Sequence, residues 1–504
     1  MSFPIIEMRG ISKRFGSVLA NDGVGLSVAP GEILGLLGEN GAGKTTLMNI
    51  LFGVYAADHG TILIDGKPIR IRNSADALQL GIGMVHQHFH LAPRLSVLEN
   101  LLVGTPGRNG KLDITGGLEK LDKIEREFGL KLDPHKTVSS LAVGEQQRLE
   151  ILKALFRDAR LLILDEPTAV LAPPDVDGLF AALRAIAAKG LGIIFISHKL
   201  NEVRALTSRC VVLRHGRLSG EVSNPSGATA RQIAELMCGH EIIPPSRPPS
   251  KPGRTLLELE NVGTGNHPGT PLRNISFKLR AGEILGVAGV SGNGQRALAD
   301  VTSGLLKPAA GRITIDGQTV TDFSPRGLQA MGVGRIPEDR LAAGLVSNMS
   351  LAQSMALPRI SQAPFSKWGL LQQAEIAAFA ARQIREYQIR CPGPGVRTGT
   401  LSGGNLQKAL LARELAFNPK LLIVSQPTRG LDVGAAQFVY EKFLALRSAG
   451  CGLLVMSEDL EELLTISDRI LVLYEGENAG LLASRDASIA RLGLLMNGAR
   501  ELAA

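Results

Sequence analysis

The chain has 504 residues, of which 44% are hydrophobic and 20% are charged, and its formal net charge is +8. This length exceeds what one hydrophobic core usually supports, so it predicts at least two domains. No apolar run approaches the ~18 residues of a membrane-spanning helix, and the start of the chain lacks a basic segment leading into an apolar one. We therefore expect a chain that neither spans a membrane nor is secreted by that route.

Cysteine usage and charge distribution add two weaker indications. The four cysteines contain no C-x-x-C pair, which is typical of reduced thiols and predicts the cytoplasm as the compartment. The positive charge contains no run of lysines or arginines, so it is weak evidence for either a nucleic acid or an anionic membrane surface as partner.

A glycine-rich loop carries the first recognisable chemistry. Residues 38–45 fit G-x-x-x-x-G-K-[ST], and they lie between an apolar run, 33–37, and a helix-like segment, 46–51. In that context backbone N–H groups face phosphates, Lys44 reaches the β- and γ-phosphates, and Thr45 ligates Mg²⁺. The alternative is a glycine-rich turn without a ligand. The expected nucleotide-binding residues here are Gly38, Glu39, Asn40, Gly41, Ala42, Gly43, Lys44, Thr45 and Thr46.

Two further apolar runs end in polar residues. The run 161–164 is followed by Asp165 and Glu166, and the run 193–196 by Ser197 and His198. Ligands bind beyond the carboxyl ends of parallel strands, so we expect Asp165 to hold the metal and Glu166 to orient the attacking water. His198 is expected to contact the γ-phosphate. Alone, the carboxylates also fit a solvated strand end and the histidine a structural role; the joint spacing favours the catalytic interpretation.

The same pattern occurs twice in the chain. Gly38 and Gly289 are 251 positions apart (289 − 38), whereas Asp165 and Ser425 are 260 apart (425 − 165). A single nine-residue insertion in the second half would explain the change. A period this long predicts duplicated domains rather than a solenoid, whose repeats are on the order of 20–50 residues.

A proline-rich segment separates the two copies. Residues 244–253 contain too many prolines for a helix or central strand and predict a semi-rigid extended spacer. The expected organisation is a first nucleotide-binding domain at 1–240, a linker at 241–254 and a second nucleotide-binding domain at 255–504.

With these motifs, the chain resembles the ATP-binding cassette (ABC) ATPases, specifically the duplicated kind that energises bacterial sugar and nucleoside importers. The resemblance implies an α/β fold with two tandem cassettes, each having a P-loop core, an antiparallel β subdomain and an α-helical signature subdomain. It also implies that Gln87 is the glutamine-loop residue, which acts in catalysis and as a metal ligand with Thr45 and Asp165. Phe15 would stack on adenine; the alternative for Phe15 is a hydrophobic staple at the domain edge.

The resemblance further implies a signature motif, which differs between the copies. The second copy has Leu401-Ser402-Gly403-Gly404-Asn405, near the family pattern LSGGQ, and the first has Leu141-Ala142-Val143-Gly144-Glu145. Ala142 removes a hydroxyl, Val143 replaces a glycine, and Glu145 adds negative charge, so the first surface should cap a triphosphate poorly. The D-loop aspartate is Asp432 in the second copy and is replaced by Ala172 in the first.

The losses on the nucleotide side all fall in the second copy. It has Gln295-Arg296 for the lysine and threonine, Ser425-Gln426 for the carboxylates, Glu458 for His198, Glu338 for Gln87 and Asn266 for Phe15. Cassettes of this family pack head to tail, so the resemblance implies an intramolecular sandwich with one competent composite ATP site. That site would combine Phe15, Lys44, Thr45, Gln87, Asp165, Glu166 and His198 with Ser402, Gly403, Gly404 and Asp432.

The resulting prediction is an ATPase with ATP and Mg²⁺ as cofactors, in which water attacks the γ-phosphorus. The resemblance implies two transmembrane permease subunits as partners, an extracytoplasmic substrate-binding protein as an indirect partner, no nucleic acid, and a peripheral location on the cytoplasmic face of the cell membrane. The segment 91–97 is the expected docking surface for the permeases; ordinary packing of the helical subdomain is its alternative.

Two other functions and two solute classes stay open. A soluble tandem ABC ATPase acting on ribosomes or DNA is the second interpretation, although the chain lacks the long charged linkers or cysteine-rich inserts of those relatives. A non-hydrolysing regulatory protein is opposed by Glu166 and His198. Nucleosides are the first choice of solute because motifs such as Val143-Gly144-Glu145-Gln146 resemble the nucleoside branch, and a monosaccharide is the second.

Overall fold

The computed structural model contains two compact units, Met1–Ile242 and Ile243–Ala504, which are described separately. The residues that the structure describes are 4–16, 18–86, 89–105, 112–168, 171, 173–197, 199–239, 247–248, 252–265, 269–290 and 292–498. Within these ranges, no helix combines the length and apolar character needed to cross a bilayer.

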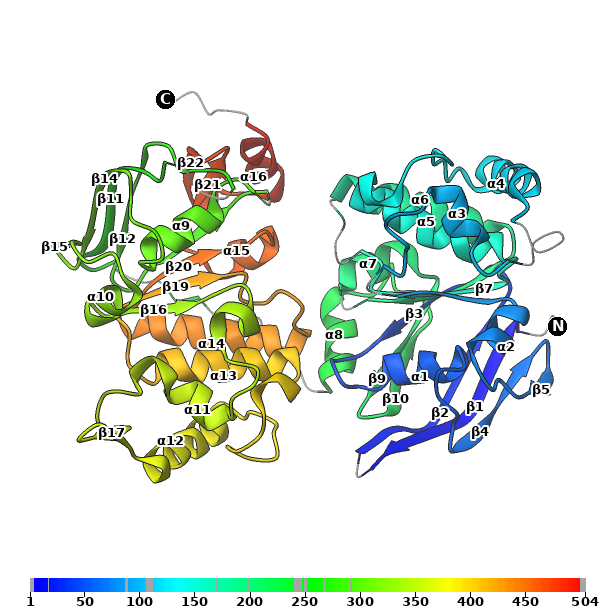
Figure 1. The fold of residues 1–504 in the computed structure, drawn as a ribbon, viewed down its shortest axis with the longest axis horizontal. Helices are drawn as coiled ribbons and strands as arrows, with labels where there is room; N and C mark the ends of the chain where they lie inside the picture. Colours follow the sequence, from blue (N-terminus) through cyan, green and yellow to red (C-terminus); the bar gives the residue numbers. More distant parts are fainter. Residues whose placement is uncertain are drawn as a thin grey trace. The chain divides into compact units, whose positions relative to one another are not determined.

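Two sheets form the frame of the first unit (Figure 1). One is antiparallel, in the order β2-β1-β4-β5, and the other has six strands in the order β10-β9-β3-β8-β7-β6. Five strands of the larger sheet are parallel, and β10 pairs antiparallel with β9 at its edge. The strands are β1 (Ile6–Phe15), β2 (Val18–Val28), β3 (Ile33–Leu37), β4 (His59–Ile64), β5 (Lys67–Ile69), β6 (Ile82–Val85), β7 (Leu161–Asp165), β8 (Gly192–Ile196), β9 (Arg209–Arg214) and β10 (Arg217–Val222).

Helices cover the sheets because the central strands need apolar partners on both faces. Strands β3 and β8 are buried at every position, as expected for inner strands of a parallel sheet. Helix α1 packs Leu47, Met48 and Leu51 into the core shared by the two sheets. The helices are α1 (Lys44–Leu51), α2 (Ser74–Gln79), α3 (Val97–Leu102), α4 (Ile114–Phe128), η1 (Val138–Ser140), α5 (Val143–Phe156), α6 (Pro173–Ala188), α7 (Leu200–Leu206) and α8 (Ala230–Cys238).

The second unit repeats this design (Figure 1). Its antiparallel sheet has the order β12-β11-β14-β15, and its six-stranded sheet the order β16-β19-β20-β13-β21-β22. Its strands are β11 (Thr255–Gly263), β12 (Ile275–Arg280), β13 (Ile284–Ala288), β14 (Ala310–Ile315), β15 (Gln318–Thr319), β16 (Val333–Ile336), β17 (Ser366–Lys367), β18 (Leu370–Leu371), β19 (Leu421–Ser425), β20 (Gly452–Met456), β21 (Arg469–Tyr474) and β22 (Glu477–Ala483).

The helices of the second unit follow the same order along the chain. Residues Ala297, Leu298 and Val301 of α9 pack into a core that both sheets line, as α1 does in the first unit. The helices are α9 (Gln295–Thr302), α10 (Pro325–Ala330), η2 (Arg340–Gly344), α11 (Leu351–Ala356), η3 (Leu357–Arg359), α12 (Gln373–Glu386), η4 (Thr398–Thr400), α13 (Gly403–Leu415), α14 (Val433–Ser448), α15 (Leu460–Ile466), η5 (Ser484–Asp486) and α16 (Ile489–Met496). The predicted fold class is confirmed.

The extra length of the second copy is distributed over three places, so the expected single nine-residue insertion is wrong. The N-cap serines of α3 and α11, Ser96 and Ser350, are 254 apart (350 − 96), which adds three residues to the spacing of 251. Helices α4 and α12 begin 259 apart (373 − 114), which adds five more. The signature motifs are 260 apart (401 − 141). The first two additions coincide with the π-helical turn η2 and with the hairpin β17–β18.

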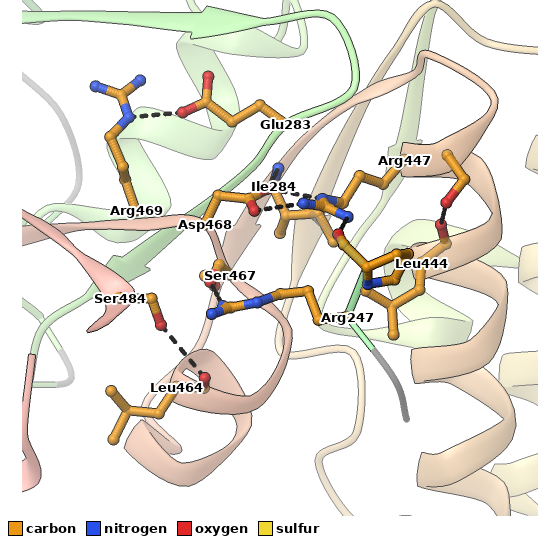
Figure 2. A network of polar contacts seen from close by, with 12 residues as sticks. Arg247, Glu283, Ile284, Leu444, Arg447, Leu464, Ser467, Asp468, Arg469 and Ser484 are labelled. Carbon is orange, nitrogen blue, oxygen red and sulfur yellow. Dashed lines mark hydrogen bonds and ion pairs between the residues drawn. The ribbon is translucent and has the colours of Figure 1, made fainter. Parts of the chain in front are cut away.

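A buried arginine holds part of the proline-rich segment against the second unit (Figure 2). The side chain of Arg447 is 2% exposed and forms two hydrogen bonds with Asp468, of 2.8 and 2.6 Å. Its Nη1 also donates to the carbonyl oxygen of Pro248, at 2.9 Å. Arg247 donates to the carbonyl oxygen of Ser467. The carbonyl oxygen of Pro248 thus adds an acceptor for the buried guanidinium of Arg447, and the bond from Arg247 to Ser467 attaches the same segment to the second unit.

Candidate active site

The glycine-rich loop of the first unit connects β3 to α1. Gly38 has φ of 148°, and Gly43 has φ of 102°. A side chain at Gly38 would place its first carbon 2.2 Å from the carbonyl oxygen of Leu213, and one at Gly43 would come 2.3 Å from that of Ala20. Both the backbone conformation and the packing therefore require glycine. The loop has the strand–loop–helix context expected of a phosphate cradle.

Lys44 is folded back into this loop. Its side chain is buried, and its Nζ donates to the carbonyl oxygens of Gly38 at 2.7 Å and Glu39 at 3.0 Å. These neutral acceptors hold the ammonium group beside the loop, where an anionic oxygen would be a stronger acceptor. Thr45, the next residue, is exposed.

Strand register brings Asp165 to the same edge of the sheet. Ile196 of β8 is the partner of both Leu36 of β3 and Asp165 of β7, so the carboxyl ends of the three strands align. Burial raises the pKa of Asp165, the charge of Glu166 raises it further, and the charge of Lys44 opposes both. Glu166 adopts a left-handed conformation, with φ of 49°, and its N–H donates to the carbonyl oxygen of Ile196 at 3.0 Å.

A buried carboxylate that was not among the predicted site residues lies behind this edge. Glu202 accepts hydrogen bonds from Thr168 at 2.7 Å and from Ser197 at 2.8 Å, and Lys199 lies 3.2 Å from its other oxygen. Glu202 thus joins the segment after Glu166 to the segment after β8. The available signal was its spacing of four from the apolar Leu206, which places both on one face of α7.

Phe15 lies at the end of β1 and is 42% exposed. Its ring contacts Tyr55 edge-on at 5.2 Å, and Lys13 Nζ lies 5.5 Å from its centroid. An exposed ring face suits an adenine platform. Gln87 and His198, together with Ala172 and Asn266, lie outside the described residues.

The glycine-rich loop of the second unit keeps its shape but loses its charge. Gly294 has φ of 106°, close to that of Gly43. Gln295 Nε2 donates to the carbonyl oxygen of Val290 at 3.2 Å, and Val290 corresponds to Glu39. A neutral amide therefore takes the place of the ammonium group of Lys44. The side chain of Arg296 is 82% exposed and lies 4.0 Å from Asp300.

The turn of the second unit that corresponds to Asp165–Glu166 has neither carboxylate. Ser425 ends β19, and Gln426 has the same left-handed φ of 49° as Glu166. Its N–H donates to the carbonyl oxygen of Met456 at 2.8 Å, and its Oε1 accepts from the N–H of Glu458 at 3.3 Å. The side chain at the position of Glu166 is thus used to hold the neighbouring loop.

The signature motif of the second unit presents an exposed hydroxyl and an accessible backbone. Ser402 precedes α13, and its Oγ accepts from Asn405 Nδ2 at 2.9 Å. Asn405 is held in turn by the N–H of Arg390, at 2.8 Å. A side chain at Gly403 or Gly404 would meet its nearest neighbour at 3.6 or 3.5 Å, which is ordinary contact. Packing within this unit therefore does not require these glycines, and a close approach by another group would explain them.

Asp432, the D-loop residue, caps the helix that follows. Its Oδ1 accepts from the N–H of Ala435 at 2.8 Å at the start of α14. The aspartate therefore has a structural role in its own unit, whatever it contacts elsewhere.

In the first unit, the residues of the corresponding signature segment make local structural contacts. Glu145 accepts from the N–H of Ala142 at 2.8 Å and pairs with Lys136 at 3.1 Å; these contacts lower its pKa. A side chain at Gly144 would come 2.8 Å from Asp175. The glutamate thus caps α5 in place of the missing serine, and Val143 is exposed.

Comparison with known proteins agrees with this geometry. Residues 21–169 and 272–429 match the model of the ABC transporter family. The glucose import ATP-binding protein TsgD13 of Haloferax volcanii is 41% identical, with 99% of this chain and 97% of that protein covered. The nucleoside import ATP-binding protein NupA of Lactococcus lactis subsp. cremoris is 40% identical, with 98% of each covered. The ribose import ATP-binding protein RbsA 1 of Rubrobacter xylanophilus is 39% identical, with 99% of each covered.

Solved structures show the same fold in a more distant protein. A crystal structure of the archaeal ribosome recycling factor aABCE1 with the stalk protein aP1 aligns over 96% of this chain and 92% of that chain, with a TM-score of 0.62 and 19% identity. Fold and loops together define a protein with two nucleotide-binding cassettes. The chain belongs to the ABC transporter family, and the family model matches both of its units.

Proposed function

We propose that the chain is the ATP-hydrolysing subunit of an importer for nucleosides or simple sugars. The observation that carries this proposal is its 39–41% identity, over nearly its whole length, to relatives named as import ATP-binding proteins. For the soluble alternative, the likeness to aABCE1 at 19% identity supports the fold alone. The presence of Lys44, Asp165 and Glu166 at one edge of the first unit's sheet favours a hydrolase over a non-hydrolysing regulator.

One composite site is proposed to carry out the hydrolysis. The first unit has Lys44 in the loop and the pair Asp165–Glu166, while the second has the exposed Ser402 beside two glycines that its own packing does not require. Each unit therefore supplies what the other lacks. The proposed nucleotide-side residues are Phe15, Gly38, Glu39, Asn40, Gly41, Ala42, Gly43, Lys44, Thr45, Thr46, Gln87, Asp165, Glu166 and His198, and the signature-side residues are Ser402, Gly403, Gly404 and Asp432.

The first unit also fits a bound Mg²⁺. Asp165 is a half-buried carboxylate with a raised pKa, and a divalent cation would stabilise its charged form. The exposed hydroxyl of Thr45 follows Lys44, as a magnesium ligand should, and Gln87 would complete the protein ligands. When bound, Mg²⁺ supplies positive charge to the phosphate oxygens.

The residues of the first unit then divide the reaction between them. Lys44 would exchange the carbonyl oxygens of Gly38 and Glu39 for phosphate oxygens, which are stronger acceptors. Glu166 would orient the attacking water and accept its proton. Its backbone N–H donates to the carbonyl oxygen of Ile196, which holds the backbone of this turn at the end of the sheet.

Two permease subunits are the proposed partners, with a substrate-binding protein acting through them at the cytoplasmic face of the membrane. Asn100 holds the segment 91–97 through two hydrogen bonds to Ala92. Its Oδ1 accepts from the N–H of Ala92 at 2.8 Å, and its Nδ2 donates to the carbonyl oxygen of Ala92 at 3.1 Å. Within the segment, Val97 is buried, residues 91, 92, 95 and 96 are partly buried, and Pro93 and Arg94 are exposed. We propose that these two residues are the part available for docking.

Cross-linking tests this partner. A cysteine at Arg94 should cross-link to co-expressed permeases, whereas a cysteine at Arg217, another exposed arginine, on β10, should not. Cross-links from Arg94 to ribosomal proteins instead of permeases would favour the soluble alternative.

The solute is proposed to be a nucleoside, because the signature and catalytic-turn segments resemble the nucleoside branch. Relatives named for glucose, nucleoside and ribose import differ by only two percentage points in identity, so identity does not separate these solutes. ATP hydrolysis by the assembled transporter should rise when its binding protein carries a nucleoside. A rise with ribose or glucose alone would make the monosaccharide class correct.

A further inference from the structure

Four polar side chains form a network beside the signature motif of the second unit. Arg340 begins the turn η2, and its Nε donates to Gln407 Oε1 at 2.7 Å. Its Nη2 donates to the carbonyl oxygen of Arg429. The guanidinium of Arg429 pairs with Glu338. One arginine thus joins the signature helix α13 to the segment that leads to the D-loop.

The guanidinium of Arg340 also lies against the signature loop itself. A first side-chain carbon at Gly403 would be 3.6 Å from Arg340 Nη1 and 3.9 Å from the carbonyl oxygen of Gly430. Gln407 is 1% exposed, so its bond to Arg340 is made inside the unit. The segment from Ser402 to Gly404 therefore lies beside both Arg340 and Gly430.

The two arginines of this network have different kinds of partner. Burial and the neighbouring charge of Arg429 lower the pKa of Arg340. Glu338 pairs with Arg429, and Asp339 accepts from the N–H groups of Leu341 and Ala342. Arg340 is held mainly by two neutral oxygens, for which the planar, multiply donating guanidinium is suited and a lysine is not.

The first copy has no sequence equivalent of this network. At a spacing of 251, Glu338 and Arg340 correspond to Gln87 and Phe89, and at a spacing of 260, Arg429 corresponds to Ala169. The network is thus found in the copy whose signature motif is intact. It occupies the segment that in the first copy carries the glutamine expected at the nucleotide.

We propose that Arg340 is a positioning residue for the signature surface, holding Ser402–Gly404 and the approach to Asp432 in one fixed arrangement. This inference rests on the proposed function, in which that surface completes the ATP site of the first copy. The segment around Glu338 then has a different role from its counterpart around Gln87 in the first copy. It supports the signature motif instead of contacting nucleotide.

Steady-state ATPase kinetics of the full-length chain test this role. Arg340→Ala should lower kcat roughly 10-fold, because a bond made by a charged donor is lost. The Kd for ATP, measured without turnover, should change less than about 2-fold, since binding begins on the first unit. Arg340→Lys should stay impaired because a single ammonium nitrogen lacks the planar fork that directs two separate nitrogens at the oxygens of Gln407 and Arg429.

Arg469 provides the matched control. It is a half-buried arginine of the same unit that bonds one side chain, Glu283, at 2.6 Å and one carbonyl oxygen, that of Lys278, at 2.7 Å. Arg469→Lys should leave kcat within about 2-fold. Equal losses in Arg340→Lys and Arg469→Lys would show a merely structural effect and overturn the proposal.

Ser402→Ala separates this inference from the proposed function. If Ser402→Ala lowers kcat while Arg340→Ala does not, the positioning role is wrong and the composite site stands. If neither change lowers kcat, the composite site itself is wrong, and the positioning role fails with it.

Discussion

The turns after β7 and β19 have the same backbone and different chemistry. Glu166 and Gln426 both have φ of 49°, and each N–H donates to the end of the neighbouring strand, at 3.0 Å in the first unit and 2.8 Å in the second. This conformation is strained for a residue with a side chain, yet it persists where no carboxylate remains. The packing of the sheet therefore maintains the turn, and the carboxylate is a separate requirement.

Behind each turn, the same buried glutamate has different neighbours. Glu202 has Lys199 at 3.2 Å, whereas the corresponding Glu462 has Asp459 three residues before it. Glu462 accepts from Ser457 at 2.5 Å and from Thr428 at 2.9 Å. Burial, with a smaller contribution from Asp459, raises its pKa to about 7. The two copies thus share the position of this glutamate but differ in the charged residues around it.

The largest expected difference between the copies is catalytic. Glu166→Gln should lower ATP turnover at least about 100-fold, because the group that accepts the proton of water is removed, while ATP binding persists. Gln426→Glu should change turnover less than about 2-fold, since Ser425 and Gln295 leave that turn without a metal ligand or ammonium group nearby. Steady-state ATPase assays on both variants measure this, and substantial turnover in Glu166→Gln would mean that the second copy hydrolyses ATP.

The dependence of stability on pH should reveal the buried carboxyl of Glu462. A carboxyl whose ordinary pKa is 4.5 and whose folded pKa is about 7 keeps its proton longer in the folded state. Between these values the folded state binds more protons, so its stability falls as pH rises, by up to about 3 kcal/mol. Glu462→Gln should remove that fall. Denaturant unfolding of both proteins at pH 5 and pH 8 measures it; an unchanged difference would place the titrating group elsewhere.

The signature motifs give the next contrast. Ser402→Ala should lower kcat roughly 10- to 150-fold if its hydrogen bond to a charged phosphate is made in the transition state. Ala142→Ser should have little effect, because Glu145 already caps that helix and the glycine-rich loop of the second copy has Gln295 in place of the lysine. Turnover assays compare the two. A strong effect at Ala142 with none at Ser402 would reverse the proposed pairing.

The smallest expected effect concerns the aromatic platform. Phe15→Ala should raise KM for ATP roughly 2- to 12-fold, in line with a stacking contribution of about 0.5–1.5 kcal/mol, and leave kcat nearly unchanged. Phe15→Tyr keeps a ring and should behave as the unmodified protein. An unchanged KM in Phe15→Ala would favour the hydrophobic staple, in which the ring packs on Tyr55.

The sequence alone determined the fold class and the separation of motifs between the copies. Glycine loops and apolar strands ending in polar residues are local patterns, and their meaning depends on bond geometry and period rather than on distant contacts. Lys44 and Asp165 were identified in this way, whereas Ser402 was identified by its resemblance to the signature motif of the ABC family. Their roles in catalysis stay predictions, as do the domain boundaries.

Only the tertiary structure decided which residues support these motifs. Arg340 lies 67 residues from Gln407, and Glu202 lies 34 from Thr168; neither pair has a sequence spacing that predicts contact. The three places at which the second copy is longer than the first also became visible only in the structure. The contact of Arg447 with Pro248 likewise depends on how distant segments meet. Buried polar groups must find partners wherever the fold places them, so these contacts follow from packing rather than from local pattern.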